Sequence, residues 1–288
     1  MKRIFFIASV LLIASITGSF AKTKTEISEG TLLPKKKETM VLISTNFGDI
    51  TIKLYNETPH HRDNFIKLVE EGFYDSTIFH RVITQFMIQG GDPDSKNAKP
   101  GQQLGNGGPG YEINPEFRSN LYHKRGALAA AREGDRVNPE KKSSGSQFYI
   151  VQGRVFTKEE MEIQMQRANQ EAISSFFATF INDPKNLKYR KQVDSCRTAK
   201  DMDGLMKLQK ELEELNKDEI AKISTVKFNK EQMELYTTVG GAPHLDGAYT
   251  VFGEVVSGID VIDKIAAVEK DGSNRPLVDI KMNMKILK

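Results

Sequence analysis

The chain has 288 residues, of which 39% are hydrophobic and 27% charged, and its formal net charge at pH 7 is +3. This composition is ordinary for a globular protein and excludes a collagen, a wholly disordered chain and a protein with many membrane spans. The single cysteine excludes a disulfide framework and a cysteine-based zinc site. The small net charge argues against a dedicated nucleic-acid-binding protein. There are 16 phenylalanines and 8 tyrosines but no tryptophan.

The amino-terminal residues have the features of a cleavable secretory signal. Lys2 and Arg3 precede an apolar run over residues 4–16, and small residues stand at the −3 and −1 positions, Ser19 and Ala21. The run is shorter than the about 20 apolar residues that a membrane span needs. A buried helix is the alternative, but it rarely has both a basic start and a small-residue exit. We therefore expect cleavage after Ala21, a flexible leader over residues 22–38, and a periplasmic or secreted protein.

From Met40 onward the sequence predicts many short strands joined by glycine-rich loops. Runs typical of strands lie at residues 41–43, 50–54, 78–83, 86–89, 127–131, 147–151, 250–256 and 278–287. Thr58-Pro59 predicts the start of a helix that ends at Gly72, and residues 258–268 predict a second short helix. Many short strands with few helices favour an antiparallel barrel or sandwich.

Residues 157–236 differ from the rest, because they are rich in Glu, Lys, Gln, Met and Leu and poor in glycine. Thr157 and Glu160 have the spacing of a capping box, and Asn229 is a candidate cap of a last helix. Leucines recur at steps of three and four residues at Leu205, Leu208, Leu212 and Leu215. We expect this stripe to be an internal packing seam rather than a partner-binding face. The stretch therefore predicts two or three helices, arranged as a helical hairpin inserted into the β domain.

The most informative segment is Phe79-His80-Arg81-Val82-Ile83-Thr84-Gln85-Phe86-Met87-Ile88-Gln89-Gly90-Gly91-Asp92. Residues two apart share one face of a strand, so Phe79, Arg81 and Ile83 are expected side by side. An arginine in an apolar strand is unusual, because burying an unpaired guanidinium is costly. Either a carboxylate or an amide pairs with Arg81, or its side chain lines a cleft and meets a ligand.

This segment resembles the F-H-R-[VI]-I-x-x-F-x-x-Q-G-G-D block of the cyclophilin family of peptidyl-prolyl cis–trans isomerases. Further blocks similar to the family follow in the same order at Gly108–Tyr111, Gly126–Arg132, Gly145–Ile150, Leu245–Gly247 and Val251–Val255. The resemblance covers about residues 40–156 and 237–288. It implies a mainly β fold, an eight-stranded antiparallel barrel closed by two helices, with an inserted α-helical segment.

The implied organisation is a signal peptide at 1–21, a leader at 22–38, barrel residues at 39–156 and 237–288, and a helical insertion at 157–236. Length alone, at roughly 150 residues per domain, predicts two domains. The resemblance replaces this with one discontinuous barrel that carries an insertion.

The resemblance also implies roles for single residues, with Arg81 as the catalytic arginine. The positions implied to bind the substrate are Phe86, Met87, Gln89, Ala131, Arg132, Phe148, His244, Leu245 and Tyr249. Among these, the large apolar residues 86, 87, 148 and 245 are the implied walls of the proline pocket, and residue 89 is the polar contact to the substrate backbone. Residue 131 and the main chain of residue 132 form the implied cleft edge. His244 stands where many members have tryptophan, Tyr249 where many have histidine, and Arg132 where asparagine is frequent.

Elementary chemistry agrees with this assignment. Rotation about a peptide bond is opposed by about 18–20 kcal/mol of resonance, although the cis and trans forms of an X-Pro bond have similar energies. An arginine N–H directed at the prolyl nitrogen stabilises the twisted amide, in which that nitrogen has regained its lone pair. An apolar pocket around the ring favours the less polar twisted state over the planar one. We therefore expect neither a cofactor nor a metal.

Other candidate sites are weaker. Residues 105–110 match G-x-G-x-x-G, but Pro109 interrupts the match and no helix is predicted to follow it. Asp92-Pro93-Asp94 predicts a turn rather than a cation site. The five histidines show no metal-ligand spacing, His80 is expected to be structural and to point away from the arginine, and Cys196 has no evident activating base.

Two functions follow as hypotheses. The first is a peptidyl-prolyl isomerase that accelerates X-Pro isomerisation in the folding of exported proteins. The second is a proline-segment binding module or chaperone, with the helical insertion as a client- or partner-binding arm. The expected partners are proline-containing and unfolded exported polypeptides, with no nucleic acid and no membrane span after signal cleavage. The cyclic peptide cyclosporin is expected to bind weakly, because the imidazole of His244 is smaller than an indole.

Overall fold

Nine strands form one antiparallel sheet in the computed structural model, which describes residues 37–223 and 227–287. The strands are β1 (Met40–Thr45), β2 (Gly48–Leu54), β3 (Thr77–Ile78), β4 (Arg81–Ile83), β5 (Met87–Gly90), β7 (Ala127–Ala130), β9 (Phe148–Val151), β10 (Val251–Ser257) and β11 (Lys281–Leu287). Their order in the sheet is β3-β11-β1-β2-β10-β7-β9-β5-β4. Two further strands, β6 (Glu112–Ile113) and β8 (Ser143–Ser144), form a separate two-stranded sheet. The expected signal peptide, and the leader up to residue 36, lie outside the described residues.

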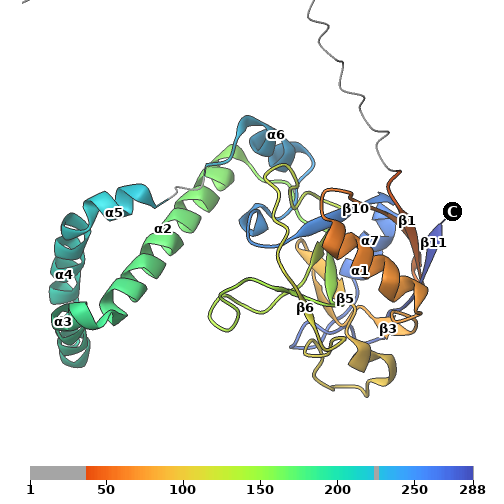
Figure 1. The fold of residues 1–288 in the computed structure, drawn as a ribbon, viewed down its shortest axis with the longest axis horizontal. Coiled ribbons are helices and arrows are strands. Elements are labelled where there is room, and N and C mark those ends of the chain that lie inside the picture. The colour runs from red at the N-terminus through yellow and green to blue at the C-terminus, as the bar shows by residue number, and fades with distance from the viewer. Residues whose placement is uncertain (1–36, 224–226, 288) are drawn as a thin grey trace, which may run out of the picture. The chain divides into compact units, whose positions relative to one another are not determined.

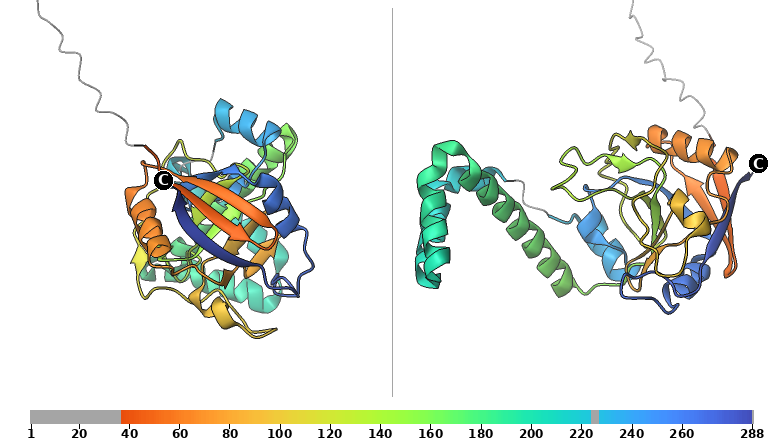
Figure 2. Two further views of the ribbon diagram at one scale, coloured as in Figure 1. Left: turned by 90° about the vertical axis from the view of Figure 1, so that its right-hand side faces the viewer. Right: turned by 90° about the horizontal axis from the view of Figure 1, so that it is seen from below.

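The sheet is strongly curled, as the left view of Figure 2 shows. Strands β3 and β4 stand at its two opposite edges, yet only Phe79 and His80 separate them in the chain. The single strand predicted over residues 78–83 is therefore two strands, because the chain passes there from one edge to the other. The expected count of eight strands is wrong for this reason, and the coarser prediction of a curled antiparallel sheet with helices holds.

Helices α1 (Pro59–Glu70) and α7 (Ile259–Ala266) pack against this sheet (Figure 1). Proline is well placed in the first turn of α1, where its missing N–H has no partner to lose. The apolar residues of both helices recur at helical spacing and face the sheet. They enter one core cluster at Phe65, Leu68, Val69, Val261, Ile262, Ile265 and Ala266, together with the inward side chains of β1, β2, β10 and β11.

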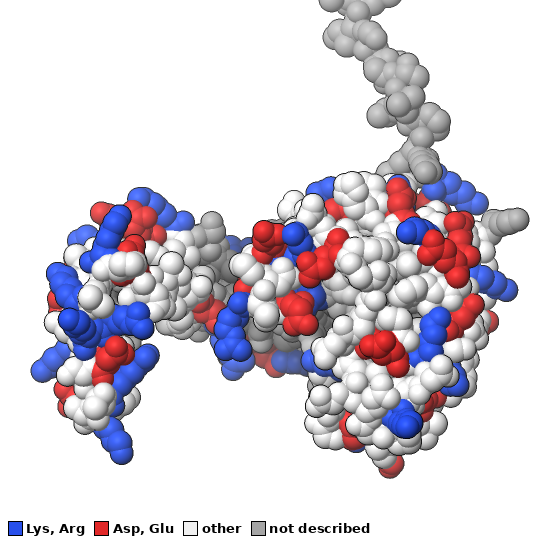
Figure 3. Space-filling view, turned by 60° about the horizontal axis from the view of Figure 1, so that its bottom comes forward, with Lys and Arg blue, Asp and Glu red and all other residues white. Residues whose placement is uncertain are grey.

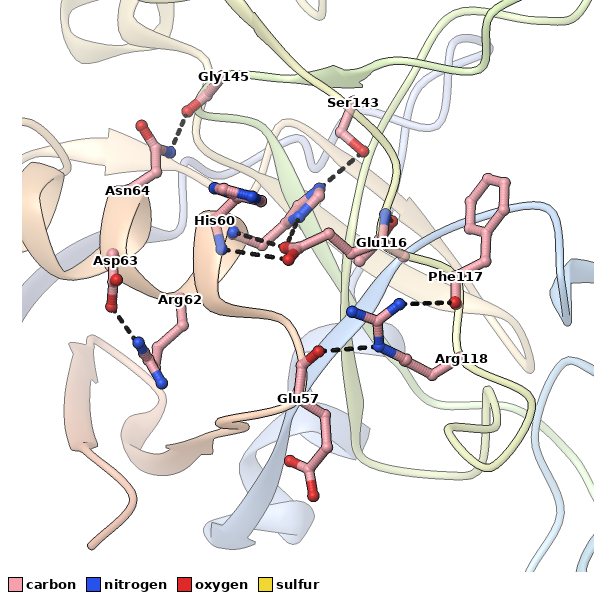
Figure 4. A network of polar contacts seen from close by, with 12 residues as sticks. Glu57, His60, Arg62, Asp63, Asn64, Glu116, Phe117, Arg118, Ser143 and Gly145 are labelled. Carbon is pink, nitrogen blue, oxygen red and sulfur yellow. Dashed lines mark hydrogen bonds and ion pairs between the residues drawn. The ribbon is translucent and has the colours of Figure 1, made fainter. Parts of the chain in front are cut away.

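A buried polar network fixes the start of α1 (Figure 4). The carboxylate of Glu116 accepts hydrogen bonds from the backbone N–H groups of His60 and His61, which are unsatisfied inside a helix, and its Oε2 lies 2.7 Å from Nδ1 of His61. The other ring nitrogen of His61 lies 3.0 Å from Oγ of Ser143. Ser143 is 1% exposed, and this serine–histidine–carboxylate arrangement holds the start of α1 through the two backbone N–H groups.

The inserted segment is helical. It contains α2 (Lys158–Asn182), the short 3-10 helix η2 (Pro184–Asn186), α3 (Leu187–Ala199), α4 (Met202–Leu215), α5 (Lys217–Lys222) and α6 (Lys230–Thr238). The capping boxes predicted at Thr157 and Asn229 are both present. The leucine stripe of α4 is an internal seam, as expected, at Leu208 and Leu212, which pack with Tyr189 and Val193 of α3. Its last member, Leu215, is exposed.

A second, separate cluster joins the two ends of the insertion to the sheet domain. Phe156, Met161 and Tyr236 are buried together, with Tyr122 and Met233 packed against them. The backbone N–H of Phe156 donates to the carbonyl oxygen of Tyr236 at 3.0 Å. The insertion therefore has a proximal part, formed by the start of α2 and by α6, and a distal part with a core of its own.

The segments that lead into and out of the insertion lie next to each other. Gly241 forms isolated β-bridges with both Lys124 and Arg154, so the two ends of the insertion lie side by side. A Cβ atom on Gly153 would lie against the backbone of Gly241, and one on Gly241 would lie against the carbonyl oxygen of His123. Glycine is required here by this close approach of backbones.

Acidic and basic side chains are interspersed on the face of the molecule drawn in Figure 3, in keeping with the small net charge. None of the helices within residues 37–223 and 227–287 combines the length and the apolar composition of a membrane span.

Candidate active site

The hairpin of β4 and β5 places Arg81 directly opposite Gln89. Nη1 of Arg81 donates to Oε1 of Gln89 at 3.1 Å. The tight turn between the strands requires a positive φ of 61° at Gln85. The sequence leaves two alternatives for this arginine, an amide partner or a position in a cleft, and the structure shows both, since Arg81 also lines a cleft.

Side-chain amides connect Gln89 with the glycine-rich loop that contains Gly105 and Gly107. Nε2 of Gln89 donates to Oε1 of Gln147 at 3.0 Å, and Nε2 of Gln147 donates to the carbonyl oxygens of Gly105 and Gly107, each at 2.8 Å. The side chain of Arg81 is thus held by a chain of hydrogen bonds that ends on backbone. Sequence analysis did not assign Gln147 to the site, although it lies within the matched block at residues 145–150.

The loop itself is anchored on Asp92, whose side chain is fully buried. Its carboxylate accepts hydrogen bonds from the backbone N–H groups of Asp94, Gly105 and Gly107. A turn was expected at Asp92-Pro93-Asp94, and the structure has one: Asp92 caps the 3-10 helix η1 (Pro93–Asn97). Within the described residues, no group of three or more His, Cys, Asp or Glu side chains is arranged to hold a metal.

The cleft has a volume of about 860 Å³ and is lined mostly by polar groups. Of the residues implied by the family resemblance, it brings together Arg81, Gln89, Ala131 and Arg132. Ala131 also belongs to an adjoining apolar cluster, so the cleft and this cluster share an edge.

We call this second feature the proline-side cluster and define it by Met87, Tyr149 and Leu245, all buried, with Phe86 and Tyr249 packed against them. The segment that supplies Leu245 is the 3-10 helix η3 (Pro243–Leu245). The exposed His244 stands at the rim, where its ring lies 5.3 Å from that of Phe86.

Two positions at which the sequence departs from the family pattern are in contact. The guanidinium of Arg132 lies over the ring of Tyr249, 4.4 Å from its centre, a favourable cation–π distance. Nε of Arg132 also donates to the carbonyl oxygen of Ala248 at 2.9 Å, and Nη1 lies 2.7 Å from Oδ1 of Asp135. These contacts fold the arginine side chain over the segment that carries Tyr249.

Phe148 does not lie in the proline-side cluster, and its assignment as a pocket wall is wrong. Its ring makes edge-to-face contacts with Phe65, Tyr74 and Phe79 in the core on the other side of the sheet, at centroid distances of 5.6, 5.8 and 6.2 Å. Side chains alternate along β9, so the neighbouring Tyr149 points into the cluster instead. The alternation alone puts Phe148 and Tyr149 on opposite faces of the sheet but does not tell which face carries the cluster.

His80 lies beside the arginine but makes no hydrogen bond with the described residues through either ring nitrogen. It is 4% exposed and lines the cleft. Burial lowers the pKa of His80 to about 4, and the charges of Arg81 and Arg275 act in the same direction, against the opposing effect of Asp92. The imidazole is therefore neutral at pH 7.

Comparisons with known proteins show the family of the chain. A family model described as cyclophilin type peptidyl-prolyl cis-trans isomerase/CLD matches residues 40–193 and 190–286. A protein of Staphylococcus aureus named as a peptidyl-prolyl cis-trans isomerase is 27% identical over 84% of this chain and 88% of its own length. A protein of Streptococcus pyogenes named as a bifunctional phosphatase/peptidyl-prolyl cis-trans isomerase is 31% identical over 83% of this chain, which spans 37% of that larger protein.

The fold is similar to that of a cyclophilin type peptidyl-prolyl cis-trans isomerase of Cryptosporidium parvum. The TM-score is 0.51 at 21% identity, over 87% of this chain and 98% of the other. A second crystal structure of that protein, obtained in the presence of the dipeptide Ala-Pro, gives a TM-score of 0.50. The family model covers nearly all of the described residues, and so the chain belongs to the cyclophilin-type peptidyl-prolyl cis–trans isomerases.

Proposed function

We propose that the protein accelerates isomerisation of X-Pro bonds in extended polypeptides, with Arg81 as the catalytic residue. The observation that carries the proposal is the position of this fixed cation at the edge of an apolar cluster. Gln89 holds the guanidinium, and Ala131 belongs to both the cleft and the proline-side cluster. A proline ring seated on Met87 and Leu245 would bring its nitrogen towards the arginine.

The chemistry needs only this arrangement. A guanidinium has five N–H donors, and Gln89 accepts one bond from Nη1, so further donors remain for a substrate. A donor directed at the prolyl nitrogen stabilises the transition state more than the planar ground state, because the nitrogen lone pair is free only when the amide is twisted. Gln89 and Gln147 hold the arginine in place before the substrate arrives, which limits the reorganisation that the reaction requires.

The substrate class follows from the family and from the cleft. The Cryptosporidium parvum protein was crystallised in the presence of Ala-Pro, and we infer that this chain likewise takes a proline with the residues that flank it. The polar cleft beside Ala131 offers amide and backbone groups to an extended peptide.

We further propose that the clients are exported proteins in the periplasm or outside the cell. The support is the sequence of residues 1–21, with its basic start, apolar run and small residues before the expected cleavage site. The test is fractionation of cells that produce the full chain. The mature protein, cleaved after Ala21, and its isomerase activity are expected outside the cytoplasm, and retention of the uncleaved chain in the cytoplasm would contradict the proposal.

For cyclosporin we propose weak binding. His244 offers a smaller ring than an indole, and its imidazole already lies against Phe86. Inhibition of the isomerase activity is expected only well above nanomolar concentrations, and His244→Trp is expected to strengthen it. Nanomolar inhibition of the unchanged protein would contradict this.

A second activity is favoured by the distal part of the insertion, which we propose as a client-binding arm. Four large apolar side chains of α3 and α4 are about half exposed or more: Leu187 (48%), Met202 (66%), Met206 (54%) and Leu215 (56%). Exposed apolar groups of this kind favour contact with unfolded polypeptides. The arm has its own core, so these side chains can be changed without disturbing the sheet domain.

The arm is tested by changing all four residues to glutamine in the full chain. Protection of an aggregating client is expected to fall, while kcat/KM for a short prolyl peptide stays the same. The matched control is Leu277→Gln with Val278→Thr, which alters two side chains that are 61% and 71% exposed but belong to the sheet domain. Equal loss of protection in both variants would show that the arm has no special role.

A further inference from the structure

Asp246 joins the proline-side cluster to helix α6 of the insertion. It follows Leu245 in the chain, and four groups lie within hydrogen-bond distance of its carboxylate. Oδ1 accepts from the backbone N–H of His123 at 2.8 Å and lies 3.0 Å from Nδ1 of the same residue. Oδ2 accepts from the hydroxyl of Tyr236 at 2.7 Å and from Nε2 of Gln232 at 3.0 Å. One oxygen of the Asp246 carboxylate is therefore bound by His123 of the sheet domain, and the other is bound by helix α6 of the insertion.

The same network reaches a second wall of the cluster through His123, which is fully buried. When Nδ1 donates to Asp246, Nε2 is left to accept a hydrogen bond. The hydroxyl of Tyr149 lies 3.0 Å from Nε2 and can donate to it. A continuous line of hydrogen bonds thus connects Tyr236 of α6, through Asp246 and His123, with Tyr149.

Helix α6 is itself held firmly against the sheet domain. Its start is capped by Asn229, and its Tyr236 is fully buried with Phe156 and Met161. None of these contacts involves the distal cluster of Tyr189, Val193, Leu208 and Leu212. Helix α6, which supplies the two donors, therefore belongs to the proximal part of the insertion and not to the distal arm.

We propose that Gln232 and Tyr236 are positioning residues of the isomerase site, which hold Asp246 and through it Leu245 and Tyr149. This inference rests on the proposed function. It assigns a role in the isomerase site to a part of the insertion, and it separates that part from the distal arm. A pocket wall that shifts loses part of its contact with the proline ring, and a misplacement of about 1 Å has a large effect on catalysis.

The test removes both donors with little change of volume, in the double variant Tyr236→Phe/Gln232→Leu of the full chain. The isomerisation rate of a short peptide with one Ala-Pro bond is measured by NMR exchange spectroscopy. We expect kcat/KM to fall about tenfold, mostly through KM, because the cluster grips the proline while Arg81 is untouched. Tyr236→Phe alone keeps one donor and is expected to show a smaller fall. If the double variant does not fold, the single variant Tyr236→Phe provides the test instead.

Two controls separate positioning from a general loss of stability. Met161→Ala opens a cavity in the same cluster as Tyr236 but removes no donor to Asp246. It is expected to lower Tm at least as much as the double variant and to leave KM unchanged. Tyr122→Phe removes a hydroxyl that contacts Asn229 and Glu231 and not Asp246, and it is also expected to leave KM unchanged.

The inference is overturned if the folded double variant keeps the KM of the unchanged protein, or if Met161→Ala raises KM as much. Failure of the proposed function would look different, since the unchanged protein would then not accelerate isomerisation at all. In that case the dissociation constant of the same peptide, measured by NMR titration, is compared between the double variant and Met161→Ala. A rise confined to the double variant supports the positioning role, and equal values refute it.

Discussion

Arg81→Ala is expected to lower kcat/KM for X-Pro isomerisation by about 10²–10³-fold, the cost of removing one preorganised donor to a developing charge or lone pair. The fall should lie in kcat rather than in KM, because the donor acts on the twisted amide and the proline-side cluster still binds the ring. The side chain is only half-buried, so thermal stability should change little.

The matched control is Gln89→Leu, which keeps the arginine but removes its 3.1 Å hydrogen bond and cuts the line to Gln147. A smaller fall in kcat is expected, since the guanidinium remains but is less well held. Arg81→Lys keeps the charge without the planar array of donors and is expected to recover little activity. Full activity in Arg81→Ala would contradict the proposed mechanism.

Acid is expected to destabilise the protein through His80, by about 2 kcal/mol between pH 7 and pH 4.5. The ring has a pKa of about 4 in the folded chain, against an ordinary value of 6.5. The unfolded chain therefore binds a proton first as the pH falls below 6.5. The stability that depends on the neutral ring is present above this pH and is lost as the pH falls towards 4.

The measurement is the free energy of unfolding in urea at the two pH values, for the unchanged protein and for His80→Gln. Carboxylates and other histidines also titrate in this range, and burial lowers the pKa of His61 in the same direction. Only the difference between the two proteins therefore reports His80. The variant is expected to lose about 2 kcal/mol less than the unchanged protein on acidification. Equal losses would show that the folded protein accommodates a charged ring at this position.

Local patterns in the sequence were sufficient where the structure depends on near neighbours. The β4–β5 hairpin brings Arg81 and Gln89 together within one motif of fourteen residues, and both capping boxes lie within four residues of their helix starts. The error at Phe148 arose because a matched block gives the order of residues but not the side of the sheet that each one faces.

Other features depend on contacts between distant segments, which no local pattern contains. Asp246 is 123 residues away from its partner His123, and the donor pair on α6 comes from a segment outside the family blocks. The break of the strand at Phe79 and His80 is similar, because each half pairs with a different edge of the sheet. Such contacts can be identified only in the folded structure.

The glycine junction around Gly241 has a consequence for how this chain can be altered. Because Gly241 is bridged to both Lys124 and Arg154, the two ends of the insertion are held side by side against the sheet domain. The length of chain between α2 and α6 can then vary without strain on the sheet, provided that the first turn of α2 and the whole of α6 are retained. A different helical module could therefore be inserted at this junction without changing the sheet domain.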